Sequence, residues 1–288
     1  QKLLFDNGGS VALSVNKSFK KFELCPASVT KGTPTYLSRG FSLYSAFKGS
    51  VASILKILAL DKPITMFKHH CFPKEIILQA VYFKLRFSLS YRDIEELLSI
   101  RGVKVDHSTI QRWVFKFSPL IEMEFRKRKK PVGNRWRLDE TYIKVKGEWR
   151  YLYRAVDKEG NTIDFLLTKR RQRMSAQSFL IKAIENNGKP TLINIDKSGS
   201  NSSAIRVYNR RALATKSRIK IRQCKYLNNI VEQDHRFIKK RIVQGLGFKE
   251  FESARRTLVG VEIVHMLRKN QMIGQDETMF DSFRSLAS

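Results

Sequence analysis

The sequence predicts a mixed α/β fold that follows a separate, all-helical segment. Apolar residues recur at helical spacing between residues 72 and 118, and at strand spacing from residue 134 onward. Three strand-like runs then give way to alternating helices and strands, which is the order of a mixed sheet flanked by helices. We therefore expect three regions, residues 1–65, 66–130 and 131–288.

Composition points to a polyanionic partner. The 288 residues include 55 Lys and Arg against 26 Asp and Glu, a formal net charge of +29, and an excess of this size indicates nucleic acid. The 42% of hydrophobic residues argues against a wholly disordered chain. Three widely separated cysteines exclude a disulfide framework and a zinc module with paired Cys ligands. We see no signal peptide and no apolar run that could span a bilayer, so we expect a cytoplasmic protein without a membrane partner.

Residues 1–65 differ in character from the rest of the chain. They are rich in Ser, Gly and Lys, and neither a helical nor a strand period persists in them. The segment opens with Gln1, whereas the motif-bearing sequence begins at Met66. We leave this region unassigned and expect a poorly ordered appendage, translated from upstream DNA.

Two capped helices are predicted within residues 66–130. Ser90 is an N-cap with Asp93 at N3, a variant of the capping box, and Gly102 is a natural stop. Asp106 caps the next helix, in which apolar residues recur at i, i+3, i+4 and i+7. Two such helices joined by a short turn form a helix-turn-helix, although an ordinary helical pair would look the same.

The second helix of a helix-turn-helix lies in the major groove of DNA, with its first residues at the base edges. The outward residues here are hydrogen-bond donors and cations, as reading of the groove requires. These candidate DNA-binding residues are His107, Ser108, Gln111, Arg112 and Lys116. The net charge favours this interpretation over a plain helical pair. The basic run at 126–130 is expected to be a linker.

Three carboxylates stand out by position. Asp139 lies inside the first strand-like run, and Asp196 ends a buried one, where a charge is costly unless it is paired or metal-bound. Glu232 lies on a later predicted helix, where one face places this carboxylate beside cationic side chains. Those side chains are His235, Arg236 and Lys239. Spacing alone does not choose the three acids over their competitors, which are Glu140, Asp157, Asp164 and Asp234.

Longer motifs make the choice. The segments LDETYIKV, TLINIDKSGSN and YLNNIVEQDHRFIKKR resemble the three catalytic blocks of DDE transposases. The order is Asp139, Asp196 and Glu232, with 35 residues between the last two, and Lys239 follows on the same helix face. Together with FPKEIILQAV, LSYRDIEELL, VDHSTIQRWV and GVEIVHMLRK, these blocks resemble bacterial insertion-sequence family six, the replicative, cointegrate-forming group. The resemblance runs from about Met66 to Gln271.

The resemblance implies a ribonuclease-H-like catalytic fold and a transposase that cuts DNA and joins the freed 3′-OH to a target. Catalytic roles fall on Asp139, Asp196, Glu232 and Lys239. Gathered carboxylates repel one another, so we expect two Mg²⁺ ions, with Mn²⁺ as a possible substitute. Asp139 and Asp196 would hold the metals, Glu232 would complete one site, and Lys239 with Arg236 would bind the backbone phosphate. The family also implies a homodimer or larger assembly on double-stranded DNA, both element ends and target.

Two alternatives stay open. A helix-turn-helix DNA-binding protein with an inactive, decayed catalytic domain explains the charge and the helix pair equally well, but not the three-acid pattern. A ribonuclease-H-like nuclease without strand transfer explains the acids, but it does not need a sequence-reading helix pair. No Gly-rich ATP-binding loop is present in the sequence, so an energy cofactor is not implied.

Overall fold

The structure is a computed structural model that describes residues 4–5, 11–12, 66–68, 70–196, 199–210, 218–244 and 247–287. The chain divides into two compact units, Gln1–Pro63 and Ile64–Ser288. In the first unit, strands β1 (Leu4–Phe5) and β2 (Val11–Ala12) pair antiparallel. The expectation of a poorly ordered appendage otherwise concerns residues outside those that are described.

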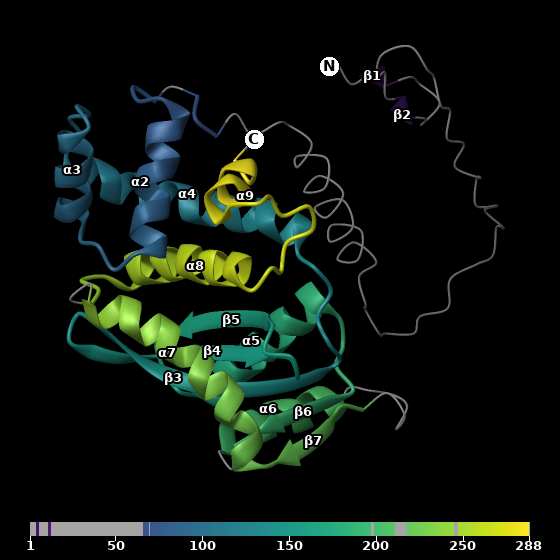
Figure 1. Cartoon of the computed structure of the whole chain (residues 1–288). Helices are drawn as coiled ribbons and strands as arrows, with labels where there is room; N and C mark the ends of the chain where they lie inside the picture. Colours follow the sequence, from purple (N-terminus) through teal and green to yellow (C-terminus); the bar gives the residue numbers. More distant parts are fainter. Residues whose placement is uncertain are drawn as a thin grey trace. The chain divides into compact units, whose positions relative to one another are not determined.

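The second unit is a five-stranded mixed sheet with helices around it (Figure 1). Its elements are α2 (Lys74–Arg86), α3 (Tyr91–Ile100), α4 (His107–Arg128), β3 (Arg135–Val145), β4 (Glu148–Val156), β5 (Thr162–Thr168), α5 (Arg173–Asn187), β6 (Leu192–Ile195), α6 (Gly199–Arg210), β7 (Lys220–Gln223), the 3₁₀ helix η3 (Lys225–Asn228), α7 (Asn229–Gln244), α8 (Phe251–Arg268) and α9 (Met279–Ser285). The strand order is β5-β4-β3-β6-β7. The first three strands are antiparallel, whereas β6 and β7 run parallel to β3. The predicted mixed sheet, flanked by helices and preceded by an all-helical segment, is confirmed.

A tight hairpin sets the register of the two longest strands. Lys146 and Gly147 both have positive φ, 50° and 79°, as the two central residues of a type I′ turn require. Val145 therefore pairs with Glu148, and the ladder continues back to Asp139 opposite Arg154. The turn residues thus fix which side chains meet in the centre of the sheet.

The sheet separates two apolar clusters. Alternate residues of β3 point to opposite faces, so Trp136 and Leu138 pack with α5, whereas Ile143 and Val145 join the larger cluster of the helical layer. Asp139 shares its face with Ile143, because the two positions are four residues apart on one strand. This is the face that α7 contacts.

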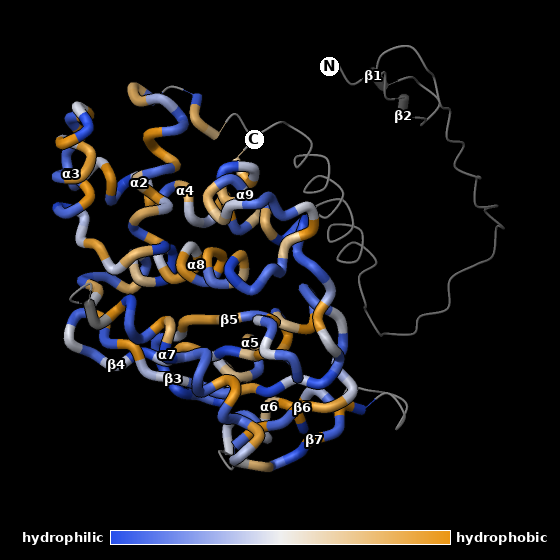
Figure 2. Tube along the Cα trace, in the orientation of Figure 1, coloured by the Kyte–Doolittle hydropathy of each residue, from blue (hydrophilic) through white to orange (hydrophobic). Residues whose placement is uncertain are grey.

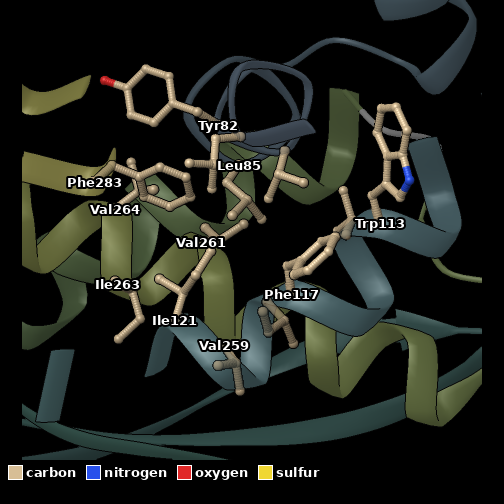
Figure 3. Close-up of a cluster of buried hydrophobic side chains, with 14 of the residues drawn as sticks. Tyr82, Leu85, Trp113, Phe117, Ile121, Val259, Val261, Ile263, Val264 and Phe283 are labelled. Carbon is tan, nitrogen blue, oxygen red and sulfur yellow. The ribbon is translucent and has the colours of Figure 1, made fainter. Parts of the chain in front are cut away.

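Helix α8 lies between the helices α2 and α4 and the sheet (Figure 1). Every residue from Thr257 to Leu267 is buried, because neighbours cover the helix on both sides. Figure 2 colours much of α8 and of β5 as hydrophobic. Figure 3 shows how side chains of α8, such as Val261 and Val264, meet Leu85 of α2 and Phe117 of α4 in one cluster. The helices and the sheet therefore share a continuous core, and the division predicted at residue 131 stays a prediction.

Gly260 allows α8 to approach its neighbours closely. A Cβ atom at this position would lie 2.6 Å from both methyl carbons of Leu85 and 2.8 Å from Oγ of Ser118. We therefore expect Gly260→Ala to lower the free energy of unfolding by about 1–3 kcal/mol, measured by urea denaturation. Gly199→Ala is the matched control, because its added Cβ would meet no atom within 4 Å. A gain in stability at Gly260, as helix propensity alone would give, would contradict this packing.

The charged run at 126–130 differs from the expected linker. Helix α4 continues to Arg128, and Arg126 Nη2 lies 3.2 Å from Oδ1 of Asp164 in β5. Lys129 Nζ donates to Oδ1 of Asn187 at 2.7 Å. Acidic and amide groups of the sheet region hold these cations, so the run joins helix and sheet rigidly. Among the described helices, none is long and apolar enough to cross a lipid bilayer.

Candidate active site

Two of the predicted acids lie on neighbouring parallel strands, Asp139 inside β3 and Asp196 directly after β6. The last paired residues of β3 and β6 are Arg137 and Asn194, and Asp139 and Asp196 each lie two residues further along their strands. Parallel strands in register bring such positions to the same level of the sheet. Asp139 and Asp196 are both half-buried there.

Helix α7 carries the third acid across this face of the sheet. Val231, His235 and Ile238 form its buried stripe, spaced i, i+4 and i+7. The residue that follows each member of this stripe is exposed; these residues are Glu232, Arg236 and Lys239. The remaining residue predicted for this basic face, His235, is only 4% exposed. Helix packing thus separates the three exposed charged groups from the histidine.

His235 is not a cation, contrary to the expectation from spacing. Its Nδ1 lies 3.6 Å from Oδ2 of Asp139. Burial, together with the nearby charge of Arg154, lowers the pKa of His235 to about 3. The ring is therefore neutral at physiological pH and contacts Asp139 as a polar but uncharged neighbour.

The electrostatics of Asp139 reflect the other two acids. Burial, together with the negative charges of Asp196 and Glu232, raises the pKa of Asp139 to about 7, although a backbone hydrogen bond from Glu140 opposes the shift. Asp196 and Glu232 thus both lie within electrostatic range of Asp139. The oxygens of the three carboxylates do not all lie within 4.8 Å of each other. An oxygen-only donor set with this mutual repulsion fits a hard divalent cation.

A pair of buried amides joins the three segments that carry the acids. Asn194 Nδ2, on β6, donates to Oδ1 of Asn228 at 2.6 Å. Asn228 Nδ2, at the entry to α7, donates to the backbone carbonyl of Leu138 in β3 at 3.4 Å. Each of these residues precedes one of the acids in the chain: Leu138 directly precedes Asp139, Asn194 comes two residues before Asp196, and Asn228 comes four residues before Glu232. This amide bridge therefore fixes the strands and the helix relative to one another beside the carboxylates.

Three of the competing acids each have a structural partner. Asp157 accepts hydrogen bonds from the backbone N–H groups of Glu159 and Asn161 in the turn that follows it, and from that of Gly133. Asp164 pairs with Arg126 and Lys182, and Glu140 pairs with Arg171. The partners of Asp164 and Glu140 are at least 18 residues away in the sequence, which is why spacing could not separate these structural acids from candidate catalytic ones.

Sequence reasoning missed a buried charge network behind the site. Arg154 is fully buried in β4. Its Nε and Nη2 donate to the two carboxylate oxygens of Glu262 in α8, at 2.7 and 2.9 Å. Its Nη2 also lies 2.7 Å from Oδ2 of Asp234 in α7, and Asp234 contacts His265 at 2.5 Å and Lys269 at 2.7 Å. The available signal was an arginine and a glutamate, each inside an otherwise apolar run.

This network holds α7 against the sheet. Burial alone would raise the pKa of Asp234, but the hydrogen bond from His265 and the charges of Arg154 and Lys269 hold it well below its ordinary value. Asp234 is therefore ionised, and its charge is compensated inside the protein. Because Asp234 lies two residues after Glu232, the network anchors the turn of α7 that carries the third acid.

The predicted helix pair forms as expected from its caps. The Ser90 hydroxyl accepts from the Asp93 backbone N–H and the Asp93 side chain accepts from the Ser90 N–H, which completes a capping box. Asp106 accepts from the backbone N–H of Ser108 and begins α4. The turn between the helices passes through Gly102, which has a φ of 76°. The pair is thus built on the local signals that predict it.

The five residues proposed to read DNA differ in their surroundings. Gln111 and Arg112 are exposed on the first turns of α4. Lys116 is exposed, and its Nζ lies 2.8 Å from Nε2 of His70. The others lie beside acids: Ser108 donates to Asp106, and His107 Nδ1 is 3.0 Å from Oε2 of Glu95 and 3.4 Å from Asp106. In the described part of the chain, Glu95, Asp106 and His107 are the one group of three potential ligands within 4.8 Å.

Residues 133–271 match the family described as a DDE domain, DDE_Tnp_IS240. The transposase for insertion sequence-like element IS431mec of Staphylococcus aureus strain N315 is 42% identical over 207 residues, which are 70% of this chain and 88% of that protein. The transposase for insertion sequence element IS257 in transposon Tn4003 of Staphylococcus aureus has the same identity and coverage. These matches define a DDE phosphoryl-transfer enzyme. The chain belongs to the insertion-sequence transposases of the IS431/IS257 type, which is family six.

Solved integrase structures are also similar to part of the chain. The HTLV-2 integrase catalytic core domain in complex with magnesium, in its dimeric form, is 22% identical over 39% of this chain and 71% of that one, with a TM-score of 0.30. The catalytic core domain of BIV integrase is 14% identical over 53% of this chain and 95% of that one, with a TM-score of 0.35.

Proposed function

We propose that Asp139, Asp196 and Glu232 form the catalytic centre of this transposase. The observation that carries the proposal is the placement of Asp139 and Asp196 at the same level of the parallel strands β3 and β6, two residues beyond their last pair. Burial and the charges of Asp196 and Glu232 also raise the pKa of Asp139 to about 7. The same acids stand in the order and spacing of the family's catalytic blocks. The competing carboxylates Asp157, Asp164 and Asp234 are committed to structural partners.

The donor set supports a pair of Mg²⁺ ions, held by Asp139 and Asp196, with Glu232 completing one of the two sites. Bound there, the ions would neutralise the carboxylates and stabilise the charge that develops on the attacking and leaving oxygens of a phosphodiester. The neutral ring of His235, 3.6 Å from Asp139, would limit the directions in which that carboxylate can turn. The amide bridge of Asn194 and Asn228 would keep the strand positions in register.

Lys239 and Arg236 would bind the DNA backbone beside the acids. Both are exposed on the face of α7 that carries Glu232, and cationic side chains position phosphates without reading sequence. The reaction would first release a 3′-OH by hydrolysis of one phosphodiester. That hydroxyl would then attack a phosphodiester of the target, forming one P–O bond as another breaks.

Recognition of the element ends would fall to α3 and α4, through His107, Ser108, Gln111, Arg112 and Lys116. Two ends must be brought together for joining, so we propose that a homodimer or larger assembly acts on them. Because the substrate is the DNA of the element and its target, the reaction would take place in the bacterial cytoplasm.

The proposal is tested by incubating the full chain with a labelled duplex that carries the element's terminal repeat. In the presence of Mg²⁺ we expect nicking, and joining when the duplex ends in a pre-cut 3′-OH. Binding without nicking would indicate the alternative, a DNA-binding protein with a decayed catalytic domain. Nicking without joining would indicate a nuclease.

Arg112→Ala is expected to weaken binding to the element end by about 1–3 kcal/mol and to relax its sequence preference. The exposed guanidinium on the first turns of α4 suits a base edge in the major groove. The measurement is fluorescence anisotropy with terminal-repeat and scrambled duplexes at one salt concentration. Arg284→Ala removes the same charge from the exposed face of α9 and should leave the preference unchanged. Equal losses on both duplexes would assign Arg112 to the backbone instead.

A further inference from the structure

A groove lies between the β3–β4 hairpin and the second half of α7. Its cavity volume is about 580 Å³, and its lining includes Tyr142, Trp149 and Lys239. Lys239 belongs both to this groove and to the exposed face of α7 that carries Glu232. The groove therefore adjoins the candidate active site without containing any of its three acids.

Two aromatic rings are exposed at this groove. Tyr142 is 45% exposed and Trp149 is 59% exposed. Their ring centroids are 6.4 Å apart with the planes at 80°, an edge-to-face contact in which neither ring is stacked on the other. Large aromatic rings that stay exposed together on one surface indicate a binding site.

The groove is also cationic. Lys144 Nζ lies 5.9 Å from the centre of the Trp149 ring, and Lys146 and Lys239 are exposed at the rim. Among the described residues that line the groove there is no Asp or Glu. Glu148, at the hairpin turn, is paired with Arg150. Aromatic rings among lysines form a surface that suits a ligand with both a flat ring and a negative charge.

We propose that this groove binds an unpaired nucleotide of the DNA strand, with its base stacked on Trp149 or Tyr142 and its phosphates beside Lys144, Lys146 and Lys239. Aromatic rings within a positively charged groove bind single-stranded nucleic acid by stacking and charge, with little sequence preference. The inference rests on the proposed function, because it assumes that the strand passes the three acids.

The position of the groove sets how far the nucleotide lies from the chemistry. Glu232 and Lys239 are seven residues apart on α7, which is about 10 Å along the helix. At about 3.4 Å per nucleotide for a strand in duplex DNA, this distance spans about three nucleotides, and fewer where the strand is unpaired and extended. The stacked base is therefore expected within about three nucleotides of the cleaved phosphodiester.

Intrinsic fluorescence reports on this groove. The chain has three tryptophans, and Trp113 and Trp136 are only 4% and 1% exposed. Quenching by acrylamide therefore reports chiefly on Trp149. We expect a short oligothymidylate to reduce the emission of the full chain and to protect it from acrylamide. An abasic oligonucleotide of the same length and charge should do neither.

Variants separate stacking from charge. In anisotropy titrations with labelled strands, we expect the wild-type chain to bind oligothymidylate about 5- to 150-fold more tightly than the abasic strand. In Trp149→Ala this ratio should fall toward one, and Trp149→Phe should keep part of it. Phe87→Ala removes another exposed ring, at the end of α2 and outside the groove, and should leave the ratio unchanged.

Several outcomes would contradict the proposal that this groove binds a nucleotide. An unchanged ratio in Trp149→Ala would do so, provided that urea unfolding shows the variant folded. A change in mass with protein concentration that Trp149→Ala abolishes would instead assign the groove to a second copy of the chain. Mg²⁺-dependent nicking by the wild-type protein, measured in parallel, tests the proposed function separately. Nicking without a preference for oligothymidylate over the abasic strand would contradict only the nucleotide-binding groove. That preference without nicking would contradict only the catalytic proposal.

Discussion

Asp139→Asn is expected to abolish Mg²⁺-dependent strand cleavage and joining, while binding to the element end stays within about twofold of the wild type. The amide keeps the shape of the side chain but cannot supply the anionic oxygens that a hard divalent ion prefers. The helices proposed to read DNA lie on the other side of α8, so their surface is unchanged. Gel analysis of nicked and joined products, together with anisotropy for binding, makes the measurement.

Two controls separate a lost catalyst from a damaged fold. Burial and neighbouring negative charges raise the pKa of Asp139 to about 7, so its ionisation costs free energy in the metal-free protein at neutral pH and above. The neutral Asn should therefore leave the urea unfolding midpoint unchanged or raise it. Glu185→Gln removes a negative charge from an exposed position of α5 and should keep full cleavage. Substantial cleavage by Asp139→Asn would remove this residue from the proposed centre.

Arg154→Met is expected to destabilise the protein by about 3–5 kcal/mol. The substitution keeps most of the apolar volume but leaves Glu262 and Asp234 buried without their common partner. The measurement is the free energy of unfolding in urea at neutral pH. In the same measurement, Arg255→Gln breaks a solvent-exposed pair with Glu252 and should cost less than about 1 kcal/mol.

A double substitution shows whether the cost comes from the uncompensated charge. In Arg154→Met combined with Glu262→Met, one of the two stranded acids is gone, so part of the loss should be recovered. No recovery, or a loss below about 1 kcal/mol for Arg154→Met alone, would contradict the view that this network anchors α7.

Local signals in the sequence predicted most of the architecture. The Ser90 capping box, the Asp106 cap and the stop at Gly102 all involve residues within a few positions of one another, so their physics is complete in a short segment. The alternation in β3 and β4 likewise follows from neighbours along one strand. The placement of Asp139 within one strand and of Asp196 just after its parallel neighbour then followed from the sheet.

What the sequence did not predict depends on distant partners. Arg154 meets Glu262 across 108 residues, and Arg126 meets Asp164 across 38. A pattern within a short segment contains no information on such distant pairs. For this reason the basic run at 126–130 was expected to be a linker, and His235 was expected to be a cation. Helix α9 was likewise not expected, because its short apolar pattern acquires meaning only against α2 and α8.

The central place of α8 has a consequence for biosynthesis. The helices that are made first in the second unit, α2 and α4, complete their packing against a helix that begins only at Phe251. In a nascent chain these apolar surfaces therefore remain exposed to solvent until nearly all of the chain has left the ribosome. During that time the chain can aggregate or bind chaperones. A copy of the gene truncated before this helix would yield a product that lacks a support for both the helical layer and the sheet.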